Sequence, residues 1–243
     1  MMTSFEDFRK AWVKATTLGF LMFLLMIPIS LILLSFFRPP ELEGQPIAQI
    51  LQQAATRSAL DYGLKMYIAL QSGHFIHYLI VGTVLALLQY NILREFIRNK
   101  VWWTAMTVLG LEVILLGDLI FMGLSTGGAP GPLEPLLIGL GGGGLMAFMQ
   151  YLYLRSTGVT SGKWVGWWIL GILTGILASA LVIFIYEFFI AEHVRQAVPP
   201  LASVLIGWLS FILPYFGLIG FFAGLLSARP LYRALQSSQG EHQ

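Results

Sequence analysis

The chain has 243 residues, of which 57% are hydrophobic and 11% are charged, and its formal net charge is +2. About one quarter of the residues of a typical soluble domain are charged, so this composition excludes an ordinary soluble protein and indicates one that is embedded in lipid. The small net charge and the lack of Lys/Arg-rich runs argue against a nucleic-acid-binding protein. The chain contains no cysteine, which excludes disulfides, thiolate metal sites and cysteine nucleophiles.

Six apolar stretches are long enough to cross a bilayer, which requires about 20 residues per helix. The backbone must satisfy its own hydrogen bonds inside the hydrocarbon, and no short alternating segments typical of a barrel occur, so the stretches are predicted to be helices. We therefore predict an all-α membrane fold that forms a single domain over residues 1–243. The predicted transmembrane helices are approximately 16–37, 73–94, 101–124, 133–155, 164–190 and 201–227.

Two segments lie outside these helices and have a recognisable character. Residues 46–62 carry Ile47, Ile50 and Leu51 at helical spacing, which predicts a short amphipathic helix on the outer membrane surface. This helix either forms a lid over an outward-facing pocket or only covers the ends of the other helices. The polar residues 234–243 are expected to form a flexible tail.

Lysine and arginine are distributed unequally between the two sides that six crossings create. Ten lie on the side of the two termini and four on the other side, and cytoplasmic loops are enriched in these residues. We therefore expect a multi-pass protein of the bacterial plasma (inner) membrane with both termini in the cytoplasm. Arg94 and Arg155 end two of the helices on that side, where we expect them to bind phosphates of membrane lipids.

A six-residue pattern occurs twice, as QYNILR at 89–94 and QYLYLR at 150–155. Small residues four apart precede each copy, and a basic turn and a tryptophan pair follow it. In the odd-numbered helices a tryptophan precedes a glycine by seven residues, about two turns, so that both lie on one face. These pairs are Trp12–Gly19, Trp103–Gly110 and Trp168–Gly175. We predict three tandem helical hairpins, formed by helices 1–2, 3–4 and 5–6.

The combined pattern, carried by residues 82–110 and 143–175, resembles one that recurs in uncharacterised multi-pass membrane proteins of bacteria, including photosynthetic ones. These two stretches make up about a quarter of the chain, and a weaker echo of the pattern elsewhere extends the resemblance to about half of it. The resemblance implies no activity. A photosynthetic source would make the thylakoid membrane an alternative location. Six helices, a cytoplasmic N-terminus and a long first outer loop are also similar to the layout of the substrate-binding subunits of energy-coupling vitamin transporters.

Two acidic residues lie within the predicted 101–124 helix. Glu112 is near its middle, and ionisable side chains inside lipid are costly and commonly functional. It is interpreted either as a proton or cation site that faces the bundle or as a neutral carboxyl group hydrogen-bonded to a neighbouring helix. Asp118 lies further out and shares a ligand site with Glu112 only if a cavity wraps around the helix. Otherwise Asp118 is solvated at the membrane interface.

Gln89 and Gln150 lie just inside the predicted hydrocarbon boundary. Their amides either form hydrogen bonds to a neighbouring helix or face a bound head group, quinone or pigment. Repetition of the pattern favours the packing role, because a repeated unit repeats its contacts.

Gly141 and Gly143 belong to a glycine-rich stretch of the predicted 133–155 helix. Glycine lets another helix approach closely, or it lets the helix unwind and build a binding site, as in transporters. The stretch lies at a depth comparable to that of Glu112. This common depth is the main sequence argument for a ligand-binding cavity at the bilayer midplane.

His74 and His77 share a face at the outer end of the predicted 73–94 helix, and Glu187 lies at the outer end of the 164–190 helix. Imidazoles and a carboxylate bind divalent metals when they converge. The alternative is a pair of ordinary interfacial histidines. No other catalytic motif is present in the sequence, so no catalytic residue and no cofactor is assigned.

These observations leave three classes of function open. The first is a protein that binds or transports a small molecule through a midplane cavity. The second is a non-catalytic accessory or assembly subunit of a larger membrane complex, with a membrane protein as its partner. The third is a membrane enzyme that acts on lipid through the outer histidine and glutamate residues.

Overall fold

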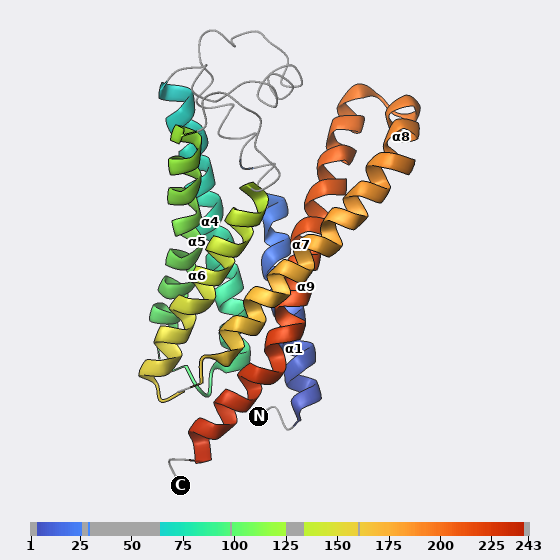
Figure 1. The fold of residues 1–243 in the computed structure, drawn as a ribbon. Helices are drawn as coiled ribbons and strands as arrows, with labels where there is room; N and C mark the ends of the chain where they lie inside the picture. Colours follow the sequence, from blue (N-terminus) through green and yellow to red (C-terminus); the bar gives the residue numbers. More distant parts are fainter. Residues whose placement is uncertain are drawn as a thin grey trace.

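Figure 1 shows the fold of the chain in a computed structural model. The structure describes residues 4–25, 29, 64–97, 99–124, 134–159 and 161–240. The side chains of residues 64–74, 113–124 and 134–139 lie outside this description, as does the predicted surface helix at 46–62.

The described part of the chain is helical and contains no strand. The elements are α1 (Phe5–Leu21), the 3-10 helix η1 (Met22–Leu25), α4 (Leu64–Leu93), α5 (Lys100–Leu124), α6 (Glu134–Ser156), α7 (Lys163–Phe189), α8 (Ala191–Ala197) and α9 (Pro200–Gly240). The predicted all-α class is therefore confirmed.

Three described segments are long and apolar enough to cross a membrane: Phe75–Leu93, Lys163–Phe189 and Leu209–Ser238. The membrane character predicted from composition is supported by these three helices. The predicted spans 16–37 and 133–155 include residues outside the described set, and the side chains of half of the predicted span 101–124 lie outside it, so a total of six crossings stays a prediction.

The six long helices pack in a ring that closes between the first and the last of them. The principal contacts join α1 to α4, α4 to α5, α5 to α6, α6 to α7, α7 to α9 and α9 back to α1. Both chain termini lie at one end, called here the termini end, and the opposite end is called the distal end (Figure 1). Toward the distal end α7 and α9 lean away from α4 and α5.

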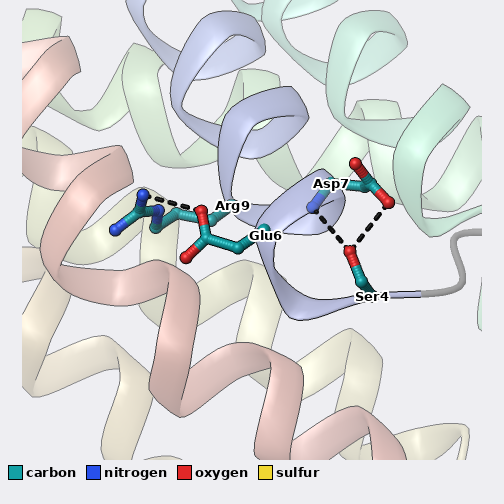
Figure 2. A network of polar contacts seen from close by, with 4 residues as sticks. All are labelled: Ser4, Glu6, Asp7 and Arg9. Atoms are coloured by element: carbon teal, nitrogen blue, oxygen red, sulfur yellow. Dashed lines mark hydrogen bonds and ion pairs between the residues drawn. The ribbon is translucent and has the colours of Figure 1, made fainter.

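Local sequence signals set the helix boundaries at the termini end. Ser4 caps α1, because its hydroxyl oxygen accepts a hydrogen bond from the Asp7 amide at 3.2 Å and donates to the Asp7 carboxylate at 2.7 Å (Figure 2). Arg9 and Glu6 form an ion pair of 2.7 Å on the same turn. At the start of α5, Asn99 Oδ1 accepts from the Val101 amide at 2.9 Å.

The end of α6 shows why the following turn contains glycine. Gly158 has a φ of 102°, a left-handed conformation that residues with a side chain seldom adopt. The amides of Gly158 and Val159 donate to the carbonyl oxygens of Arg155 and Leu154, which is the hydrogen-bond pattern of a Schellman motif. The chain therefore reverses sharply between α6 and α7.

Glycines also let the helices approach closely at the termini end. A Cβ atom placed at Gly110 would overlap the backbone of Met146 in α6, and one placed at Gly171 would lie 2.5 Å from the Cα atom of Ala223 in α9. One placed at Gly19 would overlap the Leu85 side chain of α4. These contacts fix the register between neighbouring helices.

α9 differs from its prediction at the termini end. It continues through Pro214 and Pro230 to Gly240 and contains 41 residues, about twice the number that a bilayer requires. The residues expected to begin a flexible tail, Ala234 and Leu235, are buried in the core. Polarity alone suggested a tail, but the apolar residues among the polar ones continue the packed face of the helix.

Candidate functional site

Gln89 and Gln150 come together at the termini end of the ring. The Gln150 side-chain amide donates to Gln89 Oε1 at 2.7 Å and to Thr107 Oγ1 at 2.9 Å. All three side chains are 0% exposed, and they belong to α6, α4 and α5. The predicted hydrogen bonding of the two glutamines to neighbouring helices is therefore present.

A second buried hydrogen bond joins the first and the last helices. The Trp12 indole N–H of α1 donates to Ser227 Oγ of α9 at 3.0 Å, and the Ser227 hydroxyl donates to the Ala223 carbonyl at 2.6 Å. Trp12 and Ser227 are 0% exposed. Ser227 stands where the glutamine pattern of 89–94 and 150–155 would place a third glutamine.

The glycine contacts show which residues occupy equivalent positions in the ring. Gly19 and Gly110 each lie seven residues after a tryptophan. Gly19 contacts Leu85 and Gly110 contacts Met146, and each of these partners lies four residues before a glutamine. In α7 this position belongs to Gly171, which contacts Ala223, four residues before Ser227.

The tryptophan equivalent to Trp12 and Trp103 is therefore Trp164. The prediction placed Trp168 there, because Gly175 also follows Trp168 by seven residues. Sequence spacing does not distinguish two tryptophans one turn apart on the same face, whereas the contact partners do. Trp168 instead packs against Trp12 and Phe20 of α1, with ring centroids 6.1 and 6.4 Å apart.

Glu112 lies on α5 two residues beyond Gly110. Both carboxylate oxygens are shielded from solvent, and neither has a hydrogen-bond partner among the described side chains. Asp118 lies on the same helix, but its side chain is outside the described set. The structure therefore describes the carboxyl group of Glu112 alone, and a ligand site shared with Asp118 stays a prediction.

The two glycines predicted to shape a ligand site have different surroundings. A Cβ atom placed at Gly143 would overlap the side chain of Ile172 in α7, so Gly143 is a packing position. Gly141 is exposed, and no atom lies within 4 Å of a Cβ atom placed there. α6 is continuous through both residues, so the glycine-rich stretch does not unwind it.

His77 lies in an aromatic cluster formed with Phe23, Tyr78 and Phe216. Phe23 stacks on Phe216 with centroids 4.2 Å apart and contacts the His77 ring edge-on at 5.1 Å. The cluster joins η1, α4 and α9 on the distal side of the buried tryptophans.

The metal site predicted for His74, His77 and Glu187 is only partly within the described residues. Glu187 is exposed on α7, and the His74 side chain is outside the described set. Among the described residues, no three histidine or acidic side chains gather as metal ligands would. His77 itself is 2% exposed, enclosed by the aromatic rings.

Arg94 and Arg155 are exposed at the termini end, as lipid-binding residues would be. Near them, the Lys100 ammonium lies 5.8 Å from the centroid of the Tyr90 ring, which is within the range of a cation–π contact.

Sequence reasoning missed residues that position the site. Thr107 accepts the Gln150 hydrogen bond, and Tyr153 of the second QYxxLR copy holds the α4–α5 turn. The Tyr153 hydroxyl accepts from the Asn99 amide at 2.8 Å and donates to the Asn99 carbonyl at 3.2 Å. Thr107 lies four residues after Trp103 and three before Gly110, so helical spacing alone places the three residues on one face of α5.

No protein-family model, no curated protein and no solved structure matches this chain.

Proposed function

We propose that the protein binds or transports a small molecule at a site in the middle of the bundle beside Glu112. The observation that carries the proposal is the carboxyl group of Glu112, which is shielded from solvent and has no partner among the described side chains. An ionisable group in a membrane-spanning helix is expensive and usually serves a ligand or an ion. A cation or a hydrogen-bond donor is the chemical class that fits a carboxyl group.

The packing of the termini end favours entry of the ligand from elsewhere. Trp12, Trp103, Trp164 and Trp168 are all 0% exposed and fill the ring on that side of Glu112. A ligand would therefore reach Glu112 from the distal end or from the lipid. Transport, as opposed to binding, would require this packed end to open.

The proposed topology has six crossings in three tandem hairpins, with the termini end in the cytoplasm of a bacterial plasma membrane. Support comes from the helix order, from the matching glycine contacts and from the location of both termini at one end. In this topology Arg94 and Arg155 bind lipid phosphates at the inner surface.

Native mass spectrometry of protein extracted gently from its own membrane tests the binding site. Wild-type protein is expected to carry a non-covalent small-molecule adduct that Glu112→Gln loses, while the variant keeps its folded charge-state distribution. Glu192→Gln, which alters an exposed carboxylate on α8, serves as the control and is expected to retain the adduct. The proposal is wrong if Glu112→Gln shows the same adducts and the same thermal stability as wild type.

A second candidate function is an accessory subunit of a larger membrane complex. It is favoured by the distal part of α7, where Phe184, Phe188 and Phe189 are each more than 60% exposed. Such an aromatic surface packs against lipid or against a partner helix. Stoichiometric co-purification of one membrane protein, lost on replacing these phenylalanines by alanine, would support this function over the first.

A further inference from the structure

Two hydrogen bonds at the termini end show how the polar side chains of adjacent helices meet. In one bond the Trp12 indole of α1 donates to Ser227 of α9, and in the other the Gln150 amide of α6 donates to Thr107 of α5. All four side chains are 0% exposed. The first bond involves a tryptophan that lies seven residues before a close-contact glycine, Gly19. The second involves a residue that lies three before such a glycine, Gly110, so the two bonds define two kinds of contact.

The register in which these bonds form occurs three times around the ring. Each time, a tryptophan is followed by a hydrogen-bonding residue four positions later and by a glycine seven positions later. The three sets are Trp12, Thr16 and Gly19; Trp103, Thr107 and Gly110; and Trp164, Trp168 and Gly171. Each glycine contacts the residue four positions before Gln89, Gln150 or Ser227, respectively.

Six hydrogen-bonding atoms in these sets and in the two facing glutamines have no partner among the described residues, although all six side chains are 0% exposed. They are Thr16 Oγ1, Gln89 Nε2, Gln150 Oε1 and the indole nitrogens of Trp103, Trp164 and Trp168. A buried polar atom without a partner is strongly unfavourable, and a lipid environment offers no water to replace the partner. The native protein is therefore expected to pair these atoms with one another.

We propose that each of the two observed bonds is repeated at the other two equivalent positions. In the manner of Trp12 and Ser227, the Trp103 indole donates to Gln89 Oε1. In the same manner, the Trp164 indole donates to Gln150 Oε1. These pairs join α5 to α4 and α7 to α6, which are helices in direct contact.

The second kind of bond extends in the same way. In the manner of Gln150 and Thr107, the Gln89 amide donates to Thr16 Oγ1 in α1. The Trp168 indole donates to Ser227 Oγ in α9. Both pairs lie one turn toward the termini end from a close glycine contact, Gly19 with α4 and Gly171 with α9.

The donors and acceptors of this scheme balance. Each of the four unpaired N–H donors meets an oxygen that has a lone pair to offer. An amide oxygen and a hydroxyl oxygen each accept two hydrogen bonds, so Gln89 Oε1 serves both Gln150 and Trp103, and Ser227 Oγ serves both Trp12 and Trp168. A single rule, taken from two observed bonds, thus provides a partner for all six atoms.

The resulting structure is a closed girdle of nine side chains that links every neighbouring pair of helices in the ring. Its members are Trp12, Thr16, Gln89, Trp103, Thr107, Gln150, Trp164, Trp168 and Ser227. Because the girdle spans the ring with bulky indoles, a solute moving along the ring axis at the termini end has to break it. This gating role rests on the proposed function, whereas the hydrogen-bonded girdle does not.

Indole ¹H–¹⁵N spectra of tryptophan-labelled protein in nanodiscs test the girdle, with the signals assigned by single Trp→Phe variants. Trp103 and Trp164 are expected to exchange their indole protons slowly, like Trp12, while the exposed Trp102 and Trp167 exchange quickly.

In Gln150→Leu the Trp164 proton is expected to shift upfield and to exchange about tenfold faster, the effect of one lost hydrogen bond. Gln236→Leu, on the exposed face of α9, is the control and should move neither signal.

Ser227→Ala provides a second test of the girdle in the same indole spectra, because this small replacement preserves the packing around residue 227. It should shift the signals of Trp12 and Trp168 together and leave that of Trp164 in place. The girdle is overturned if Trp164 is insensitive to Gln150→Leu in folded protein, or if only Trp12 responds to Ser227→Ala.

Glycerol permeation into proteoliposomes, followed by light scattering, tests the gate separately. Trp103→Ala/Trp164→Ala is expected to raise permeability, whereas Trp102→Ala/Trp167→Ala, which alters two exposed tryptophans, should not. Equal permeability of the two double variants would overturn the gating role. Glu112→Gln should leave all indole signals unchanged, so failure of the proposed ligand site is distinguishable from failure of the girdle.

Discussion

The two ends of α7 show two kinds of environment along one apolar helix. Trp164, Trp168 and Ile172 at the termini end are 0% exposed, whereas Leu177, Phe184 and Phe188 toward the distal end are between 61% and 71% exposed. Hydrophobicity is high throughout this helix, so it does not set the difference. Glycines set it, because Gly171 and Gly175 let α9 approach the termini half of α7.

The comparison indicates that the termini half holds the fold together and that the distal half offers surface. Inside a membrane, lipid is as apolar as a leucine side chain, so close packing and hydrogen bonds between helices have to provide the stability. The termini half has both. In the described distal half, the α7–α9 pairing and the aromatic cluster around Phe23 are the main contacts between long helices.

The largest effect on stability is expected from a side chain that prevents one close approach in the termini half. In Gly110→Val the new side chain would overlap the Met146 backbone, and the two helices would have to separate. We expect a loss of about 3 kcal/mol of stability or failure to fold, the upper range for an overpacked core. Thermal unfolding in detergent with size-exclusion chromatography measures it.

Gly141→Val is the matched control, because it adds the same side chain to an exposed glycine of a neighbouring helix with no atom nearby. It is expected to be neutral or slightly stabilising, since valine has a better helix propensity than glycine. Equal effects of the two variants would show that the glycine contacts do not hold the ring together.

The aromatic cluster gives a smaller effect that sharpens the boundary between the halves. Phe23→Ala removes a ring that stacks on Phe216 and is 5% exposed, and we expect a loss of about 2–3 kcal/mol, at or below the range for buried phenylalanines. Phe188→Ala removes a ring that is 71% exposed and should change stability by less than about 0.5 kcal/mol. If Phe23→Ala and Phe188→Ala lost similar amounts of stability, the packed half of the protein would extend beyond Phe188.

The sequence predicted the helical class and the interhelical role of Gln89 and Gln150. Both predictions rest on local physics, the length of an apolar run and the cost of an amide in hydrocarbon. The choice between Trp164 and Trp168 failed because both lie on the packed face of one helix. The end of α9 was also misjudged, because Ala234 and Leu235 are buried by tertiary contacts that polarity along the chain does not reveal.

Other parts of the site depend on partners that lie far away in the sequence. Tyr153 and Asn99 are 54 residues apart, and Trp12 and Ser227 are 215 apart. A spacing rule names the face on which a residue lies, but it does not name the opposite helix. For the same reason, the sequence indicated that His77 shares a face with His74 but not that Phe23 and Phe216 would pack near it.

Closure of the ring between α1 and α9 is the central structural claim, and the absence of cysteine from the chain allows a direct test. In Phe20→Cys/Gly220→Cys the two Cβ positions are 2.9 Å apart, slightly closer than the roughly 3.5–4.5 Å of a disulfide, so a small adjustment permits the bond. Mild oxidation in native membranes, followed by peptide mass spectrometry, should yield one intramolecular crosslink. Phe20→Cys/Gly166→Cys, which uses a glycine with no atom near its Cβ position, should yield none. Two free thiols in the first variant, in protein that remains folded, would contradict the closed ring.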